Sequence, residues 1–194
     1  MDRGLHPRRI ECGRSRETAK RSDLAGWAEY GYCASHSRYF WGLRLHLVCT
    51  LHGLPLGWAL TGAKANERDV LEDLLATTPA LASRPGRRTI IADKGYNGHA
   101  LEQRLQQHGI DLLRPARKGE KPQAGSRFFK PLRQIIESVN DTLKGQLDLE
   151  LPGGRTPTGI CTRIAQRILA LTAAIWHNDL IGAPVLRSLT AYDH

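Results

Sequence analysis

Apolar and polar residues alternate along residues 39–49, and this pattern predicts a half-buried β-strand. The inward positions are every second residue: Trp41, Leu43, Leu45, Leu47 and Cys49. His52 and Gly53 then give a turn signal, so residues 54–60 are predicted to return beside that strand as a hairpin. Residues 1–37 are polar, with only a short periodic stretch at 5–12. We therefore expect an N-terminal segment that keeps a remnant of a first strand, followed by one domain at residues 38–194.

Helical and strand patterns alternate through the rest of the chain. The predicted helices run from the N-cap Asn66 to Leu75, from the N-cap Asn97 to His108, from Pro131 to about Leu147, and over 157–177. The predicted strands are residues 89–93 and 110–113, and a short terminal segment lies at 184–189. This order predicts an α/β fold with helices around a mixed central sheet.

The strand at 89–93 ends in the first candidate for chemistry, Asp93. The three residues before it, Ile90, Ile91 and Ala92, are continuously apolar, which is typical of a strand buried on both faces. In open α/β sheets, ligands bind beyond the carboxyl ends of such strands, so Asp93 is a candidate metal ligand and Lys94 a candidate phosphate contact. The alternative is that Asp93 only forms the turn before Gly95, by bonding its own backbone.

The second candidate carboxylate, Glu137, lies in the predicted helix after Pro131. On a helical wheel Arg133, Glu137 and Lys144 fall within about 40° of one another. The apolar face lies beside this stripe and consists of Leu132, Ile136, Val139, Leu143 and Leu147. The stripe is therefore predicted to border the core. The alternative is a surface Glu137 that simply pairs with Arg133 one turn earlier.

Positive charge is concentrated just ahead of this helix. The chain has 28 Lys and Arg residues against 19 Asp and Glu residues, a formal net charge of +9, which favours a polyanionic partner. Residues 114–133 contain one acid, Glu120, and seven bases: Arg114, Arg117, Lys118, Lys121, Arg127, Lys130 and Arg133. The loop at 115–128 is accordingly predicted to contact nucleic acid, with Arg117 and Lys118 on phosphates.

The cysteines and the hydropathy pattern limit the other classes. Four scattered cysteines form no disulfide framework and indicate a reducing cytosol. The spacings Cys33-x-x-His36 and His46-x-x-Cys49 suggest zinc, but residues three apart on a strand point to opposite faces, which disfavours it. No apolar run reaches about 18 residues and no signal peptide opens the chain, so we expect a soluble cytoplasmic protein without a membrane partner.

Two motifs together resemble a known family. Ala92-Asp93-Lys94-Gly95-Tyr96 and the series Arg133-x3-Glu137-x6-Lys144 are similar to motifs of the DDE transposases of bacterial insertion sequences. The hairpin that begins at Tyr39 also resembles the strand that follows that family's first catalytic acid. The resemblance covers about Glu11 to about Trp176 and implies a ribonuclease-H-like mixed sheet flanked by helices.

What the resemblance implies is metal-dependent cleavage and transfer of DNA strands. Asp93 and Glu137 match the second and third acids of a catalytic triad that holds two Mg²⁺ ions, with Mn²⁺ as a substitute. The DNA contacts would come from five bases: Lys94, Arg117, Lys118, Arg133 and Lys144. The implied partners are transposon ends and target DNA, bound by a homo-oligomer in the cytoplasm at the nucleoid.

The chain departs from the family pattern at its beginning. The first Asp is expected where His6 or Pro7 stands, and Asp2 lies too early. One imidazole nitrogen cannot bridge two hard cations as a carboxylate does, so we expect impaired catalysis. Lys130 also stands where the family has a tyrosine. The simplest hypothesis is a chain truncated at its N-terminus.

Two other functions remain open. The first is a non-catalytic transposase remnant that binds DNA or dimerises. The second is another ribonuclease-H-like nuclease, such as a resolvase or a repair nuclease.

Overall fold

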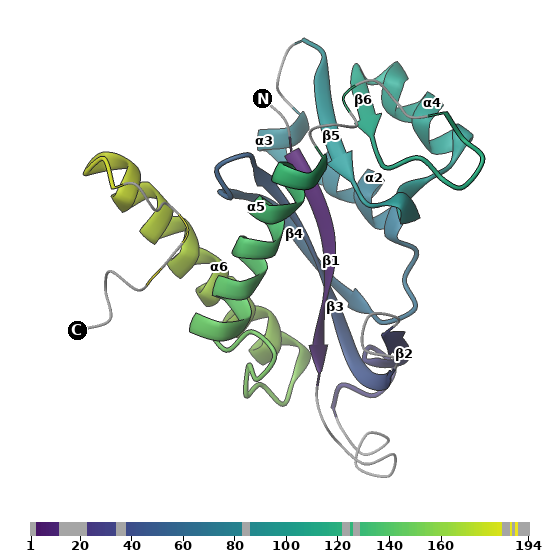
Figure 1. Ribbon diagram of the computed structural model, residues 1–194. Coiled ribbons are helices and arrows are strands. Elements are labelled where there is room, and N and C mark those ends of the chain that lie inside the picture. The colour runs from purple at the N-terminus through teal and green to yellow at the C-terminus, as the bar shows by residue number, and fades with distance from the viewer. Residues whose placement is uncertain are drawn as a thin grey trace. The chain divides into compact units, whose positions relative to one another are not determined.

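The computed structural model forms two compact units (Figure 1). Unit 1 comprises Met1–His6, His46–Trp58 and Asn66–Val139, and unit 2 comprises Pro7–Leu45, Ala59–Ala65 and Asn140–His194. The residues that the structure describes are 3–11, 23–33, 38–82, 86–121, 125, 129–183, 187 and 189.

Four strands come first along the chain, and strands and helices alternate after them. The strands are β1 (Arg3–Glu11), β2 (Glu29–Cys33), β3 (Arg38–Thr50), β4 (Pro55–Gly62), β5 (Arg88–Ala92) and β6 (Ile110–Leu113). The α-helices are α2 (Glu67–Thr77), α3 (Pro79–Ala82), α4 (His99–Gln107), α5 (Phe129–Asp141) and α6 (Pro157–Leu180). A 3₁₀ turn, η2 (Lys94–Tyr96), follows β5, and a π-helical turn, η4 (Thr142–Gln146), follows α5.

The sheet is mixed, and its strand order is β2-β3-β1-β5-β6, with β4 paired to β3. β2 pairs with β3 antiparallel, whereas β5 pairs parallel with both β1 and β6 (Figure 1). The prediction of a mixed α/β fold is therefore confirmed. In unit 1 the parallel pairing brings the carboxyl ends of β5 and β6 to one edge of the sheet. Asp93 and Arg114 are the residues that come next along the chain.

The core of unit 1 is built from the apolar stripes of two helices and from β5. Asn66 caps α2, since its Oδ1 accepts the N–H of Arg68 at 3.1 Å, and this predicted N-cap is confirmed. The side chains buried on α2, α4 and β5 are Val70, Leu71, Leu74, Leu101, Leu105, Ile90, Ile91 and Ala92. The strand at 89–93 was predicted to be buried on both faces, and β5 meets that expectation at its last three positions.

Unit 2 is held together around α6 and the segment before it. Thr156 caps α6, with its Oγ1 accepting the N–H of Gly159 at 3.1 Å. Side chains of α6 then bond the preceding chain, because Arg167 Nε donates to Leu147 O at 2.6 Å and Arg163 Nη1 donates to Pro152 O at 3.2 Å. The predicted helix over 157–177 is confirmed and ends three residues later.

Two predicted boundaries and one predicted segment differ from the structure. The 3₁₀ turn η2 uses Asn97 as its C-cap, so α4 takes Gly98 as N-cap in place of the predicted Asn97. α5 begins two residues before Pro131, whereas its predicted end near Leu147 is matched, because α-helical bonding to Asp141 continues as the π turn η4 to Gln146. β2 lies inside the segment predicted to be polar with little periodicity.

Some predictions fall outside the described residues. These are the placement of His36, of Arg127 and of most of the segment at 184–189, and the side-chain environments of His6, Cys33 and Lys130.

Two glycines of unit 2 offer a matched test of its packing. A Cβ at Gly31 would lie 2.7 Å from Phe40 Cζ and 2.8 Å from Ala63 Cβ, whereas a Cβ at Gly145 would meet no atom within 4 Å. We expect Gly31→Ala to lower the free energy of unfolding by about 1–3 kcal/mol through overpacking. Gly145→Ala should leave it unchanged or slightly higher. Urea denaturation followed by circular dichroism measures both, and equal effects would contradict this account of Gly31.

Candidate active site

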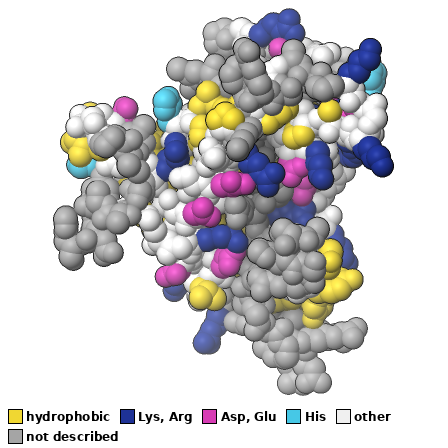
Figure 2. Space-filling model, in the orientation of Figure 1, with side chains coloured by type: hydrophobic (Ala, Val, Ile, Leu, Met, Phe, Trp, Pro, Cys, Tyr) yellow, Lys and Arg dark blue, Asp and Glu magenta, His cyan; other side chains and the backbone are white. Residues whose placement is uncertain are grey.

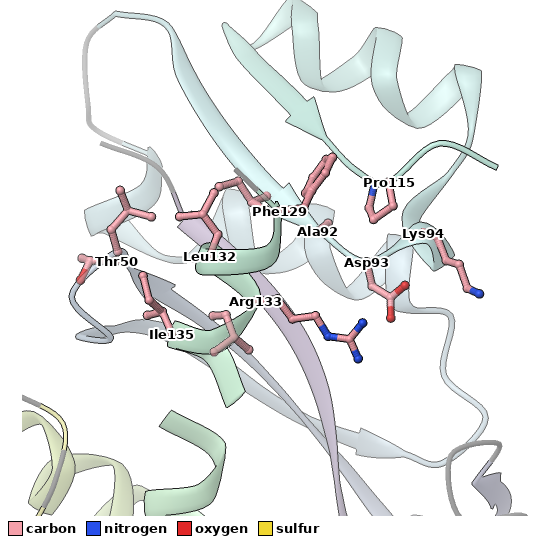
Figure 3. Close-up of a pocket in the computed structure, with 12 residues that line it drawn as sticks. Thr50, Ala92, Asp93, Lys94, Pro115, Phe129, Leu132, Arg133 and Ile135 are labelled. Atoms are coloured by element: carbon pink, nitrogen blue, oxygen red, sulfur yellow. The ribbon is translucent and has the colours of Figure 1, made fainter. Parts of the chain in front are cut away.

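A pocket of about 340 Å³ lies at the carboxyl end of β5, within unit 1. Its lining comes from the end of β3, from β5 and the turn after it, from Pro115 after β6, and from α5. Figure 3 shows the charged ends of Asp93, Lys94 and Arg133 on one side of the pocket and the apolar side chains of Leu132 and Ile135 on the other. The structure thus brings Arg133 of α5 to the same cavity as Asp93 and Lys94, which are neighbours in the turn after β5.

Asp93 is fixed by the turn that it caps. Its Oδ1 accepts the N–H of Gly95 at 3.3 Å. This is the turn-forming bond that the alternative interpretation of Asp93 predicts. The turn is anchored by Tyr96, whose side chain is fully buried, and by Arg68, whose Nη2 donates to Gly95 O at 3.5 Å. The Asp93 side chain itself is exposed. A carboxylate that is rigidly placed but solvent-accessible can cap a turn and bind a cation at the same time.

Glu137 forms an ion pair with Arg133 across one turn of α5. Arg133 Nε lies 2.8 Å from Glu137 Oε1, and the two side chains are 73% and 48% exposed. The stripe was expected to border the core, so this exposure is greater than predicted. Ile136 and Val139 are nevertheless buried on the predicted apolar face. An exposed pair of this spacing stabilises by only about 0.3–0.5 kcal/mol, so either side chain is easily drawn to another partner.

Lys144 lies beyond the α-helical part of this stretch. It lies in the π turn η4 of unit 2 and pairs with the carboxylate of Glu150. A wheel that advances 100° per residue assumes unbroken α-helical geometry, and that geometry ends at Asp141. The predicted common stripe therefore holds for Arg133 and Glu137, while its extension to Lys144 rests on a wrong premise.

The basic segment 114–133 offers less free charge than its sequence suggests. Arg114 is buried and is paired with Glu102 and Glu120 at 3.0 Å and 2.8 Å. Arg117 and Lys118 are exposed, as expected of phosphate contacts. Figure 2 shows bases (dark blue) and acids (magenta) interspersed on the face that it draws, with no continuous basic stripe. Sequence analysis missed the part played by Arg114, although the single acid in a basic run was a signal.

The position of the missing first acid follows from the pairing of β1 with β5. Gly4 pairs with Ile91 and Leu5 with Ala92 in parallel register. One step further along both strands, His6 takes the position that corresponds to Asp93. The structure therefore supports His6, in preference to Pro7, as the residue standing where the first acid was expected.

The carboxylates of Asp93 and Glu137 are the oxygen ligands that Mg²⁺ prefers. Among the described residues, no three His, Cys, Asp or Glu side chains gather closely enough to hold a metal ion. Asp93 lines the pocket, whereas Glu137 is not among its lining residues, so the described residues offer this pocket a single carboxylate.

Other features raised by the sequence lie away from this chemistry. His46 and Cys49 are both buried in β3, and burial raises the pKa of the Cys49 thiol to about 12, so it stays protonated at neutral pH. Within the described ranges, no helix is both long enough and apolar enough to cross a membrane.

Comparison with known proteins decides the family. A family model described as "Transposase DDE domain" matches residues 10–173. The chain belongs to the transposase DDE domain family. This confirms the resemblance predicted from the Asp93 and Glu137 motifs. The proposed division at residues 37 and 38 stays a prediction.

Two individual proteins are similar over part of their length. A transposase assigned to insertion sequence element IS402 of Burkholderia cepacia is 29% identical over 104 residues, which cover 51% of this chain and 47% of that protein. The chain thus spans about half the length of this curated relative. A cryo-EM structure of the piggyBac transposase synaptic complex with hairpin DNA aligns with a TM-score of 0.42 and 11% identity, covering 62% of this chain and 24% of that one.

The exposure of the Arg133–Glu137 pair leads to a test of stability. We expect Arg133→Gln and Glu137→Gln each to change the free energy of unfolding by no more than about 0.5 kcal/mol, because both side chains are largely solvated. A double-mutant cycle by urea denaturation should give a coupling of about 0.3–0.5 kcal/mol that fades at high salt. A coupling free energy several times larger would show that the Arg133–Glu137 ion pair stabilises the fold and does not open easily.

Proposed function

We propose that this chain contains the catalytic domain of an insertion-sequence transposase that binds DNA through the pocket edge at Asp93. The observation that carries the proposal is the convergence of Asp93, Lys94 and Arg133 on one cavity at the carboxyl end of β5. Family membership supports a role in transposition. The substrates are transposon ends and target DNA, and the protein acts as a homo-oligomer on DNA at the nucleoid.

The DNA contacts are assigned to exposed bases around the pocket. Lys94 and Arg133 line it, and Arg117 and Lys118 follow Pro115, which lines it as well. Arg133 is bonded to Glu137 only by an exposed pair, so a DNA phosphate competes readily for its guanidinium. Lys144, in unit 2, is a fifth proposed contact and does not line the pocket. These bases hold the DNA backbone by charge and therefore without sequence preference.

Asp93 and Glu137 are the proposed catalytic acids. They would hold divalent metal, Mg²⁺ or Mn²⁺, which when bound activates water or a 3′-hydroxyl and stabilises the leaving oxygen. The turn η2 keeps the Asp93 carboxylate in place, and α5 presents Glu137 one turn after Arg133. Release of Arg133 to a phosphate frees the Glu137 oxygen that it occupies.

We further propose that catalysis by this chain is impaired. We assign His6, which follows the paired Leu5 of β1, to the position of the third carboxylate, and an imidazole there supports impaired catalysis. This observation also favours a second candidate function, a non-catalytic remnant that binds DNA or dimerises. The two functions differ only in whether the chain cuts DNA.

Restoring an acid at position 6 tests this assignment. We expect His6→Asp to nick supercoiled plasmid DNA in Mg²⁺ or Mn²⁺ about tenfold or more faster than the unmodified chain, because a carboxylate supplies the missing ligand. Addition of Asp93→Ala should abolish the gain. Gel electrophoresis of the relaxed product measures the rate.

Matched controls separate charge from position. His6→Asn offers no anionic ligand and should gain nothing, and Pro7→Asp places its carboxylate on the opposite face of β1 and should gain nothing either. Nicking by the unmodified chain that disappears in Asp93→Ala would refute the impairment and retain the transposase. DNA binding by every variant with nicking by none would favour the remnant, and loss of both would refute the proposed function.

A further inference from the structure

We propose that Arg114 and Glu120 form a clasp that positions Arg117 and Lys118 for contact with the DNA backbone. The proposal rests on the proposed function, since it assigns a positioning role within the same DNA-binding surface. It also gives a reason for Glu120, the one acid in a segment of seven bases.

Arg114 is the fixed half of the clasp. It directly follows β6, and its side chain is only 6% exposed. Its Nε donates to Glu102 Oε1 of α4 at 3.0 Å, and its Nη1 donates to Pro115 O at 3.3 Å. A guanidinium held by a helix and by its own backbone has little freedom to move, so it can serve as a fixed anchor for a loop.

Glu120 is the half that belongs to the loop, and both of its carboxylate oxygens are used. Oε2 accepts from Arg114 Nη1 at 2.8 Å, and Oε1 accepts from Arg114 Nη2 at 3.4 Å. Oε2 also accepts the backbone N–H of Arg117 at 2.9 Å, while the N–H of Glu120 donates to Arg117 O at 3.0 Å. One carboxylate therefore closes the turn and fastens it to the anchor.

The backbone of the turn is shaped for this closure. Gly119 has a φ of +93°, a conformation that side-chain-bearing residues rarely adopt. Arg117 and Lys118 lie within the closed turn, and both are exposed. Pro115, bonded by the anchor, lines the pocket that contains Asp93. The clasp thus ties the two bases to the edge of the candidate active site.

Charge alone leads to the opposite expectation for Glu120. Its pKa is lowered by the hydrogen bond from Arg114 and by the backbone N–H of Arg117, so it is anionic at neutral pH. An anion beside a DNA-binding surface repels phosphate, and its removal should tighten binding. If the clasp orders the turn in advance, removal of Glu120 should instead weaken binding, because DNA must then order the turn itself. The two explanations differ in sign.

The experiment compares two substitutions that each remove one acid from Arg114. Glu120→Gln weakens the bonds to the loop, and Glu102→Gln weakens the bond to α4 without touching the turn. Binding of a labelled random-sequence DNA duplex is measured by fluorescence anisotropy over a series of KCl concentrations. We expect Glu120→Gln to weaken DNA binding about threefold to tenfold. The slope of log K against log[KCl] should fall in magnitude by up to about 2, because each lost phosphate contact accounts for about one. Glu102→Gln, which loosens the anchor itself, should weaken binding in the same direction and to a smaller extent.

A second variant and a second readout keep the test decisive. Glu120→Asp keeps the charge but shortens the side chain, and it should weaken binding as Glu120→Gln does. Tryptic cleavage after Arg117 and Lys118 should be faster in both Glu120 variants, and faster to a smaller extent in Glu102→Gln. Thermal melting establishes that each variant is folded.

The outcomes separate the clasp from the proposed function. Tighter binding by Glu120→Gln, together with unchanged tryptic cleavage, would overturn the clasp and leave DNA binding intact. Absence of salt-dependent DNA binding by the unmodified chain would overturn the proposed function. In that case, the rate of tryptic cleavage after Arg117 and Lys118 would still show whether the Arg114–Glu120 pair orders the turn.

Discussion

The parallel pairing of β5 with β1 and β6 is the constraint on which the candidate site depends. Register in a sheet is set for the whole strand, and a slip of one residue would turn every side chain of β5 to the other face. Ile90 pairs with Leu112 and Ile91 with Leu113, and this register brings Asp93 and Arg114, which follow the two strands, to the same edge. Asp93 and Arg114 therefore owe their common edge to the pairing of residues that take no part in chemistry.

Two arginines beside this edge use their charge in opposite ways. Arg133 is largely solvated and bonded to a single exposed carboxylate, whereas Arg114 is buried and bonded to two. Breaking a buried pair leaves an uncompensated charge in a poorly solvated place, and breaking an exposed pair does not. Arg133 is therefore available to a ligand, and Arg114 is part of the scaffold. A count of positive residues cannot make this distinction.

The sequence predicted the features that depend on local patterns. The alternation at residues 39–49, the Asn66 cap and the apolar run before Asp93 each specify an element within a few residues, and β3, α2 and β5 follow. The π turn after Asp141 has no comparable pattern, so nothing in the sequence signals that a wheel of 100° per residue stops applying before Lys144. Arg114 pairs with Glu102 of α4 and with Glu120 of the loop after β6, and β2 forms by pairing with β3. These contacts join separate elements, so a local sequence pattern does not predict them.

Tyr96 has a consequence for how the site fails. Its ring is fully buried three residues after Asp93, within the same short turn that the carboxylate caps. The backbone of the turn cannot move far unless that ring leaves the core, so displacement of the turn is coupled to the opening of unit 1 as a whole. A ligand on a loop without such a buried residue loses its backbone geometry gradually as temperature rises. The backbone at Asp93 should instead keep its geometry until the cooperative unfolding of the unit.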